Sequence, residues 1–514
     1  MVELTVGRAL RLAAERHPDR TAVTCGEARL THGELNARGN RLANGLAAAG
    51  FGKGDRLGIV LPNGVDYVAI AYAVAKAGIV MVPLNYRLRG HELAYHIADA
   101  GARGLIFGPA YREAVEEARA KAPGLRTIAA GPPSPADAAS LAELETAPAE
   151  EPAVSVSEEE LFYLGYTSGT TGRPKGAMIT HRNRALAYHY WALEYGVTGR
   201  DVALHAGPFH HTAPFGFTLM QLWMGGRVEI LPVFDARDAL VTMARAGVTW
   251  TFMVPFMLNA LLHLPAAELA RHRPRALRFV ISAASPLPTT TKEGLLATFP
   301  EVGLHEFYGA TEAGVVTNLR PEDQRRKVRC VGKPILDTEL RVLTPAGEEA
   351  KRGEIGELYM KGPTLFGGYW NAPEMTAAAI RADGGSTLGD LGYVDDEGYV
   401  YVVDRIKDVI KSGGVNIFPT EIEEALLSHP AVYEAAVVGV PDDRWGEAAR
   451  AIVVLRPGAA GEAGEILRHC RGLLADYKVP KVVEFRDALP RNPAGKVLKR
   501  VLREEFWSGR SVKV

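Results

Sequence analysis

The segment Tyr166–Gly176 carries a dense set of groups that could bind phosphate. It reads YTSGTTGRPKG and combines glycines and hydroxyl side chains with the cations Arg173 and Lys175. Glycines let a backbone approach a phosphate closely, and N–H groups, hydroxyls and an ammonium can then donate to its oxygens. The segment is not a Walker loop, because Pro174 and Gly176 stand where that pattern has glycine and Ser or Thr. Taken alone, such a loop is more often a flexible surface loop, so other motifs must decide.

The YTSGTTGRPKG segment resembles the phosphate-binding signature of the adenylate-forming enzymes. This superfamily contains acyl-CoA synthetases, aryl-CoA ligases, peptide-synthetase adenylation domains and luciferases. Further motifs occur in the family's order, so the resemblance covers essentially the whole chain. They are PFHH at 208–211, YGATE at 308–312, LGDLG at 388–392, DRIKD at 404–408, KSGGVN at 411–416 and PAGK at 493–496.

The resemblance implies an ATP or AMP site in the first part of the chain. Tyr308 would stack on adenine, Thr311 would contact the α-phosphate and Asp390 would accept from the ribose hydroxyls. Glu312 and Thr167 would hold Mg²⁺, a hard cation that suits oxygen ligands and shields the triphosphate from an incoming carboxylate. The nucleotide-binding residues implied are Thr167, Ser168, Gly169, Thr170, Thr171, Gly172, Lys175, Tyr308, Gly309, Ala310, Thr311, Asp390 and Arg405.

The resemblance also implies a catalytic lysine on a mobile domain. Lys496 would bridge the oxygens of the acid and the α-phosphate, because both reactants are anionic and need a cation as charge develops. Asp404 would be the pivot of a hinge motion that withdraws this lysine. The same motion would bring in a glycine loop that faces the channel for coenzyme A. The residues of this loop are Lys411, Ser412, Gly413 and Gly414.

For the acid itself, the resemblance points to a pocket gated by a histidine. His211 is the expected gate and a catalytic residue with Lys496, Glu312 and Thr311, and His210 is the alternative if the register shifts by one. The implied pocket walls are small or apolar, and none is cationic, which disfavours dicarboxylic acids. These residues are His211, Phe215, Ala283, Ala284, Ser285, Gly309, Gly314 and Val315.

Composition excludes several other classes of function. The 514 residues include 59 basic and 60 acidic side chains, so bulk charge attracts neither nucleic acid nor an anionic membrane. The most apolar stretch, 67–84, contains Lys76 and Gly78 and is short for a membrane span of about 20 residues. Three scattered cysteines and no apparent secretory signal favour the cytoplasm. The sequence leaves a homodimer open.

The elements that must position these residues read as an α/β fold. We expect a strand at 56–61, a helix at 65–77 ended by Gly78 with a positive φ, and a second strand at 79–83. Such a crossover predicts a largely parallel sheet covered on both faces. The Ala/Pro-rich stretch 130–152 reads as a surface excursion of one continuing core. Further strands are expected at 227–231, 249–254 and 278–281, with a helix at 237–246.

The sequence changes character after Asp404 and predicts a small α+β domain. We expect a helix at 420–428 with a Thr420/Glu423 capping box, two strands at 435–440 and 451–455, a helix at 463–474, and a basic tail from Lys478. The predicted domains are therefore residues 1–403, which bind AMP and the acyl group, and 404–514, a mobile lid with the catalytic lysine.

The favoured function is an ATP-dependent acid–CoA ligase for a monocarboxylic acid of medium-chain or aryl type. One alternative is a stand-alone enzyme that adenylates an acid and loads it onto a separate carrier protein. A non-enzymatic nucleotide-binding relative and a luciferase-like oxidase are weaker hypotheses. The identity of the acid, the pathway and the oligomeric state lie beyond the sequence.

Overall fold

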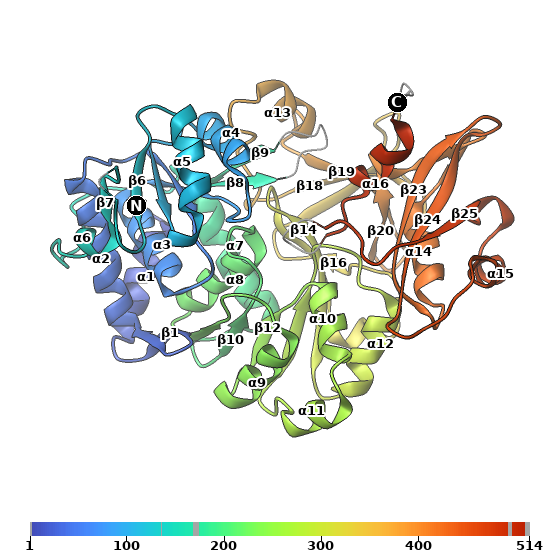
Figure 1. The fold of residues 1–514 in the computed structure, drawn as a ribbon, viewed down its shortest axis with the longest axis horizontal. Helices are drawn as coiled ribbons and strands as arrows, with labels where there is room; N and C mark the ends of the chain where they lie inside the picture. Colours follow the sequence, from blue (N-terminus) through green and yellow to red (C-terminus); the bar gives the residue numbers. More distant parts are fainter. Residues whose placement is uncertain (1–2, 135, 168–173, 492–495, 509–514) are drawn as a thin grey trace.

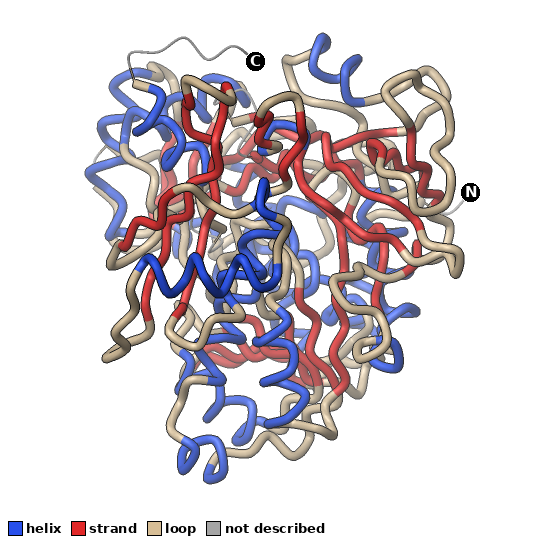
Figure 2. Tube along the Cα trace, turned by 90° about the vertical axis from the view of Figure 1, so that its right-hand side faces the viewer, coloured by secondary structure: helices blue, strands red, loops and turns tan. Residues whose placement is uncertain are grey.

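The computed structural model describes residues 3–134, 136–167, 174–491 and 496–508. Two large sheets with their helices form the N-terminal part, and a smaller sheet-and-helix unit lies at the C-terminal end (Figure 1). In the perpendicular view, helices run alongside the strands (Figure 2). The expected mixed α/β architecture, with a large N-terminal domain and a small C-terminal one, is confirmed.

The first sheet contains the predicted crossover. β3 (Arg56–Val60) and β4 (Val80–Pro83) are parallel and joined by α3 (Val65–Ala77), and Gly78 ends this helix with φ 65°. The apolar stretch is therefore a buried helix and strand, and among the described residues no helix is long and apolar enough to span a membrane. The strand order is β7 (Ala139–Ser140), β6 (Arg126–Ala129), β5 (Gly104–Phe107), β3 (Arg56–Val60), β4 (Val80–Pro83), β8 (Leu161–Thr167) and β9 (Lys175–Thr180).

The helices of this first layer include α2 (His32–Ala48), α3 (Val65–Ala77), α4 (Gly90–Ala100), α5 (Arg112–Lys121) and α6 (Leu141–Leu144). Within the stretch 130–152, β7 pairs with β6 and extends the sheet, and α6 buries Leu141 and Leu144 in the core, so this part is not the predicted surface excursion. The chain returns to the same sheet in β8. The prediction of one core that continues on both sides of this stretch is confirmed.

The second sheet is mostly parallel and has antiparallel strands at both edges. Its order is β16 (Lys333–Pro334), β15 (Gly314–Leu319), β14 (Gly303–Ala310), β13 (Phe279–Ser282), β12 (Trp250–Phe252), β10 (Val202–His205), β11 (Arg227–Ile230), β1 (Thr21–Cys25) and β2 (Ala28–Thr31). Its helices include α1 (Val6–Arg16), α7 (His181–Tyr195), α8 (Thr212–Trp223), α9 (Ala236–Ala246), α10 (Pro255–Leu262), α11 (Ala266–Arg271) and α12 (Thr289–Thr298).

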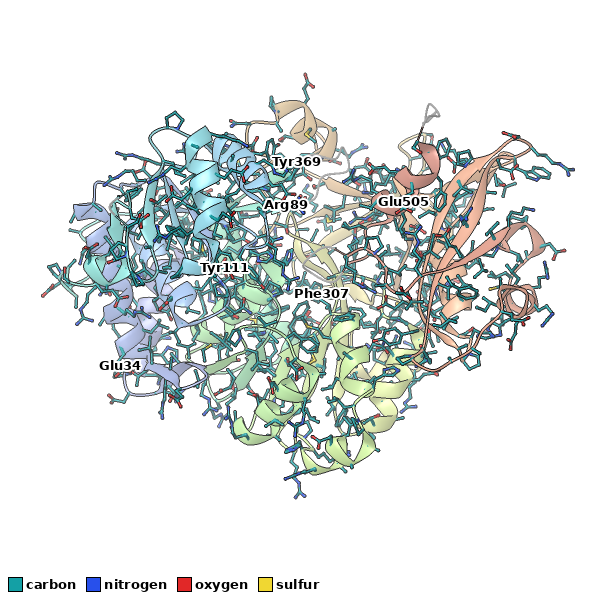
Figure 3. The ribbon with its side chains drawn as sticks, in the orientation of Figure 1. Glu34, Arg89, Tyr111, Phe307, Tyr369 and Glu505 are labelled. Carbon is teal, nitrogen blue, oxygen red and sulfur yellow. The ribbon has the colours of Figure 1, made fainter. Side chains whose placement is uncertain are left out.

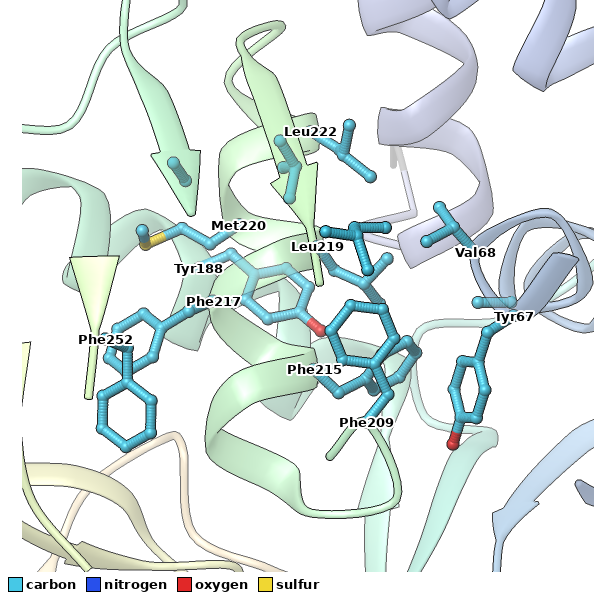
Figure 4. Close-up of a cluster of buried hydrophobic side chains, with 14 of the residues drawn as sticks. Tyr67, Val68, Tyr188, Phe209, Phe215, Phe217, Leu219, Met220, Leu222 and Phe252 are labelled. Atoms are coloured by element: carbon cyan, nitrogen blue, oxygen red, sulfur yellow. The ribbon is translucent and has the colours of Figure 1, made fainter. Parts of the chain in front are cut away.

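Both large sheets contribute to one apolar core. Tyr67 of α3 packs edge-on against Phe209 and Phe215, with ring centroids 5.5 Å apart in each pair (Figure 4). Burying an aromatic side chain of this size stabilises the fold by about 1.5–3 kcal/mol. This shared core fixes α8, and with it Phe215, relative to the first sheet.

A four-stranded antiparallel sheet lies between the two large sheets and the C-terminal unit in the sequence. It consists of β17 (Glu339–Leu343), β18 (Gly356–Lys361), β19 (Ser386–Val394) and β20 (Val400–Arg405), and α13 (Pro373–Ala379) precedes β19. β19 carries Asp390 and β20 carries Asp404 and Arg405, and the two strands pair with Asp390 opposite Arg405.

The C-terminal unit is the expected small α+β domain. Its sheet contains β22 (Val415–Ile417), β21 (Ile410–Ser412), β24 (Gly446–Leu455), β23 (Val432–Asp442) and β25 (Val482–Phe485), with helices α14 (Pro419–Leu427), α15 (Ala463–Leu473) and α16 (Lys499–Trp507). The stretch after Lys478 was expected to be a basic tail, and that prediction is wrong because it contains β25 and α16. α16 buries Leu502 and packs on β23.

The predicted capping box at Thr420 and Glu423 is also wrong. α14 begins at Pro419, and no side chain caps it. Thr420 instead donates from its backbone N–H and its hydroxyl to Asp404 Oδ2, both at 3.0 Å. Glu423 accepts from the N–H of Val437 at 2.7 Å and forms an ion pair with Lys499. Thr420 and Glu423 therefore bind residues from other segments, although their spacing predicted a local capping box.

Candidate active site

Three oxygen-bearing side chains meet where the first and second sheets approach one another. Thr167, at the end of β8, donates its hydroxyl to Glu312 Oε1 at 3.3 Å, and Tyr369 donates to the same oxygen at 3.0 Å. Glu312 is buried and follows β14. Tyr369 lies in the upper middle of the molecule in Figure 3. The buried carboxylate is therefore held in one orientation by two hydroxyl donors from different segments.

Lys175 adds a cation to this group. Its ammonium lies 4.8 Å from the centroid of the Tyr369 ring. Burial lowers the pKa of Lys175, and the Glu312 carboxylate opposes this shift. The residues between Thr167 and Pro174, which include the predicted phosphate-binding residues Ser168, Gly169, Thr170, Thr171 and Gly172, lie outside the described residues. Both described ends of the motif thus converge on Glu312.

A second group forms around Asp390. The Tyr308 hydroxyl donates to Asp390 Oδ2 at 2.7 Å, and Arg405 Nε lies 3.1 Å from Oδ1. Burial, followed by the Asp390 charge, raises the pKa of Tyr308 well above its usual value, so the phenol stays a donor at neutral pH. Thr387 instead donates to Glu357 at 2.7 Å.

Lys496 lies close to the Asp390 group although it belongs to the C-terminal domain. Burial lowers the pKa of Lys496 to about 8; the Arg405 guanidinium lowers it as well, while Asp390 and Asp408 raise it. The other residues of the Pro-x-Gly-Lys motif, 493–495, lie outside the described part of the chain. The structure thus brings the lysine into electrostatic contact with the residue pair predicted to bind ribose.

The two adjacent histidines lie at the start of α8. His211 is the N-cap residue, and its ring centroid is 4.4 Å from that of His210. Burial lowers the pKa of His211 to about 4 and that of His210 well below its usual value, so both rings are neutral at physiological pH. In the described part of the chain, His211 Nε2 has no hydrogen-bond partner.

A chain of hydroxyls links the His211 end of α8 to the YGATE segment. The Tyr163 hydroxyl lies 3.3 Å from Thr212 Oγ1, which lies 3.1 Å from Thr311 Oγ1. Because Thr212 follows His211 directly, this contact places the start of α8 beside Thr311. The sequence analysis missed Thr212 and Tyr163, although the position next to the predicted gate was a signal for Thr212.

The predicted acyl-pocket residues come from three neighbouring elements. Phe215 is buried on α8, and Ala283 is buried after β13. Ala284 is exposed with φ 78°, and Ser285 is partly exposed. Gly309 is paired with the buried Val315 across the β14–β15 turn.

The β14–β15 turn lies close to an aromatic side chain that the sequence analysis did not single out. A Cβ on Gly314 would lie 3.0 Å from Cζ2 of Trp191, and one on Gly309 would lie 1.9 Å from the Gly314 carbonyl oxygen. The indole of Trp191 is buried, and its Nε1 has no hydrogen-bond partner among the described residues. These glycines therefore let the turn approach Trp191, with no room for larger side chains.

The predicted hinge and glycine loop lie in the C-terminal part of the chain. Asp404 Oδ1 accepts from the N–H of Arg405 at 2.8 Å, while its other oxygen holds Thr420. Lys411 and Ser412 end β21, and Gly413 and Gly414 make the turn to β22 with φ 57° and 83°. Two consecutive positive φ angles are typical of a tight hairpin turn. This turn contacts Trp445 through the Gly413 N–H, which donates to the Trp445 carbonyl oxygen at 2.8 Å.

Tyr369 is the most informative residue that sequence reasoning missed. It joins Glu312 by a hydrogen bond and Lys175 by a cation–π contact. Its only sequence signal was an aromatic residue after the Gly367–Gly368 pair. Among the described residues, no group of three or more His, Cys, Asp or Glu side chains could hold a metal ion.

Two family models cover most of the chain. The model of the AMP-binding enzyme matches residues 10–370, and that of the AMP-binding enzyme C-terminal domain matches residues 421–496. The chain belongs to the AMP-binding enzyme family. The predicted membership among the adenylate-forming enzymes is confirmed.

The chain also matches curated relatives and solved structures of other proteins over nearly its whole length. It is 40% identical over 501 residues to a feruloyl-CoA synthase from Amycolatopsis sp., covering 96% of this chain and 97% of the relative. It is 37% identical over 486 residues to the long-chain-fatty-acid–CoA ligase FadD13 from Mycobacterium tuberculosis, covering 93% and 94%. The ATP-bound crystal structure of MatB from Rhodopseudomonas palustris aligns with TM-score 0.90 and 34% identity, covering 98% and 99%.

Proposed function

We propose that this chain is an ATP-dependent acid–CoA ligase that forms an acyl-adenylate and then an acyl-CoA. The observation that carries the proposal is the position of Lys496 beside Asp390 and Arg405. A cation there would face a nucleotide whose ribose is held by Asp390. The relatives named above are CoA ligases for an aryl and a fatty acid, which supports the same reaction type.

In the first step, an oxygen of the acid attacks the α-phosphorus of ATP, the bond to the bridging oxygen breaks and pyrophosphate leaves. Lys496 would neutralise the carboxylate and α-phosphate oxygens as they approach. Thr311 would donate to the α-phosphate, and Lys175 would face the departing phosphates. Tyr308 would stack on adenine while its hydroxyl keeps Asp390 oriented towards the ribose. No side-chain nucleophile is required.

Mg²⁺ fits the group formed by Glu312 and Thr167. Both offer oxygen, the ligand type that this cation takes, and the Tyr369 hydroxyl holds the carboxylate in place. The scarcity of protein ligands agrees with an ion that is bound mainly by substrate phosphates and water. When bound, Mg²⁺ would supply charge neutralisation for the triphosphate.

In the second step, the thiolate of CoA attacks the acyl carbon and AMP leaves. The C-terminal domain would turn about Asp404, withdraw Lys496 and bring Gly413 and Gly414 to the channel for the pantetheine arm. A segment without side chains suits a narrow channel. The domain boundary at 403/404 remains our prediction, and β20, which contains Asp404, ends one residue later at Arg405.

The acid is proposed to be a monocarboxylic acid of medium-chain or aryl type. The predicted walls are apolar or small, and the neutral His211 would separate the acid from the CoA channel. A second carboxylate would need a cation, and this set of walls contains none. A cytoplasmic location completes the proposal, because the three free cysteines suit a reducing compartment.

The test measures AMP and pyrophosphate release across a panel of medium-chain and aryl acids, with and without CoA. Acid-dependent release that CoA stimulates is expected. Release that ignores CoA but proceeds with a phosphopantetheinylated carrier protein would support the carrier-loading alternative. A chain that turns over none of these acids would contradict both proposals.

A Lys496→Ala variant separates the two steps. Adenylation should fall by about 10²–10³-fold, the usual loss when one charge-stabilising group is removed from a transition state. Thioester formation from supplied acyl-adenylate should change much less, because Lys496 is withdrawn in that step. An equal loss in both half-reactions would show that the two-state assignment of Lys496 is wrong.

A further inference from the structure

One face of α10 forms a contact surface for the C-terminal domain. The face contains Phe256, Asn259 and, directly after the helix, His263. The spacings of three and four residues put these side chains on the same side of a helix. In Figure 1, α10 lies in the lower middle of the molecule, below the C-terminal β-strands. Phe256 is 39% exposed, with the Arg491 guanidinium over its ring.

His263 makes the most specific of these contacts. Its Nε2 lies 2.6 Å from Nη1 of Arg456, and its Nδ1 lies 2.7 Å from the Asn259 carbonyl oxygen. Arginine can only donate, so Nε2 must accept, and Nδ1 must carry the proton that it donates to Asn259. The backbone of α10 thus fixes the tautomer that binds Arg456. The ring of His263 also packs edge-on against Tyr433, with centroids 5.5 Å apart.

The other two side chains reach the same part of the C-terminal domain. The Asn259 side chain reaches the Tyr433 phenol, where it opposes the burial that raises the pKa of Tyr433. The guanidinium of Arg491 lies 5.4 Å from the centroid of the Phe256 ring and forms an ion pair with Glu434 at 2.8 Å. The α10 face therefore contacts the start of β23 and Arg491, which lies five residues before Lys496 in the sequence.

Arg491 connects this surface to Lys496. Arg491 pairs with Val497 in an antiparallel bridge, and the N–H of Leu498 donates to the Pro490 carbonyl oxygen at 2.8 Å. These two contacts hold segments 490–491 and 497–498 together, directly beside Lys496 in the sequence. A contact that holds Arg491 in place therefore also holds the segment next to Lys496 in place.

We propose that Phe256, Asn259 and His263 are positioning residues for adenylation, which hold the C-terminal domain where Lys496 meets the nucleotide. The inference rests on the proposed function and goes beyond it, because it names the surface that selects one of the two domain arrangements. All three contacts join the N-terminal and C-terminal domains. They must open before the C-terminal domain can turn, so they favour the first half-reaction over the second.

The test compares His263→Ala, Asn259→Ala and Arg456→Ala in the two half-reactions, using whichever of hexanoic or 3-phenylpropanoic acid turns over. Adenylation is followed as pyrophosphate release in a single turnover, and thioester formation is followed from the supplied acyl-adenylate and CoA. Each variant should slow adenylation by about fivefold, the equivalent of one hydrogen bond, and leave thioester formation unchanged or faster.

A double variant and a matched control make the test specific. His263→Ala combined with Arg456→Ala should be no slower in adenylation than His263→Ala alone, because that variant has already removed the bond to Arg456. His272→Ala is the control, since this histidine ends the neighbouring α11 and its ion-pair partner, Glu268, lies in the same domain. It should leave the ratio of the half-reaction rates unchanged.

The possible results distinguish a failure of the positioning role from a failure of the proposed function. Equal losses in both half-reactions, no loss in adenylation, or strictly multiplicative effects of the two single changes would overturn the positioning role. If the unmodified enzyme forms no acyl-adenylate from any acid, the proposed function itself fails, and the inference fails with it.

Discussion

Lys496 must be protonated to act in adenylation, although its burial disfavours the charged form. Burial and Arg405 lower its pKa to about 8, while Asp390 and Asp408 partly restore it. The same cationic surroundings that would bind an anionic nucleotide therefore weaken the protonation of the free enzyme's lysine. Bound ATP, with its negative charge, should raise the pKa of Lys496 again.

This balance predicts the pH dependence of adenylation. The protonated lysine is the active form, and its pKa is lowered to about 8, so its charge is present well below pH 8, is half lost near pH 8 and is lost above it. The kcat/KM for ATP, which reports the free enzyme, should fall roughly tenfold per pH unit above about 8. The fall in kcat should begin at a higher pH, because the bound triphosphate favours the cation.

Lys496→Arg is the control for this pH profile. Guanidinium stays charged throughout the range, so the variant, although slower, should lack the fall near pH 8. The same fall in the arginine variant would assign it to another group.

The limits of sequence reasoning are visible at single residues. Thr167, Lys175 and Glu312 were found because each lies within a short motif, and the structure brings them together. Tyr369 lies 57 residues from Glu312 and bonds it only through the fold. Such a partner carries no local pattern. Trp191 was missed for the same reason, since its place beside Gly314 depends on how α7 packs against β15.

At the scale of elements, prediction succeeded where local chemistry and burial agree. The bounds of α3 were predicted to the residue, because an apolar run, a turn before it and Gly78 after it all indicate the same helix. The capping box failed because Thr420 and Glu423 bind Asp404 and Lys499 instead. α16 was missed because it is short and rich in charged residues, although its apolar side chains, among them the buried Leu502, gather on one face.

The β21–β22 hairpin permits a matched test of the glycine loop. Gly413→Ala would place a Cβ 2.7 Å from Cε3 of Trp445 at φ 57°, whereas Gly458→Ala has φ 76° and meets nothing within 4 Å. Both changes place a side chain on left-handed backbone, which costs roughly 1–2 kcal/mol, and Gly413→Ala costs more because the Trp445 ring must shift. Thioester formation should slow in Gly413→Ala alone, and adenylation should be unaffected in both variants.

Rates of both half-reactions, with thermal unfolding as the stability measure, decide this point. If Gly458→Ala slowed thioester formation as much as Gly413→Ala, the effect would belong to general destabilisation. A loss of adenylation in Gly413→Ala would contradict the assignment of the hairpin to thioester formation.

At the scale of the whole molecule, the site is assembled from parts that fold around different sheets. Glu312 follows a strand of the second large sheet, Thr167 ends a strand of the first, Asp390 lies in the four-stranded sheet and Lys496 precedes α16. The sequence order of the motifs predicted which residues belong to the site. The spacing of these motifs along the chain did not predict which arrangement of the domains brings the site residues together.

A ligand that spans these parts should join the domains. We expect a non-hydrolysable acyl sulfamoyl adenosine to protect the amides of β23 from hydrogen exchange, because Lys496 and the ligand would hold the C-terminal domain in place. At one hundred times its Kd, the ligand should stabilise the folded protein by about 2.7 kcal/mol.

The controls for this experiment are AMP and Lys496→Ala. AMP lacks the acyl group and should protect β14 and β19 more than β23. The ligand should lose most of its effect on β23 in the Lys496→Ala variant. Equal protection of β23 by AMP and the acyl ligand would contradict a bridging role.

Trp445 gives the chain an optical reporter of its own. The indole is 40% exposed at the turn between β23 and β24 and packs directly against the Gly413 tip. Indole emission shifts colour and intensity with the polarity around the ring, so insertion of this tip beside a bound ligand would alter the signal. The difference spectrum between the native chain and Trp445→Phe isolates that emission from the other five tryptophans. Stopped-flow fluorescence could therefore time the domain rotation without an attached dye.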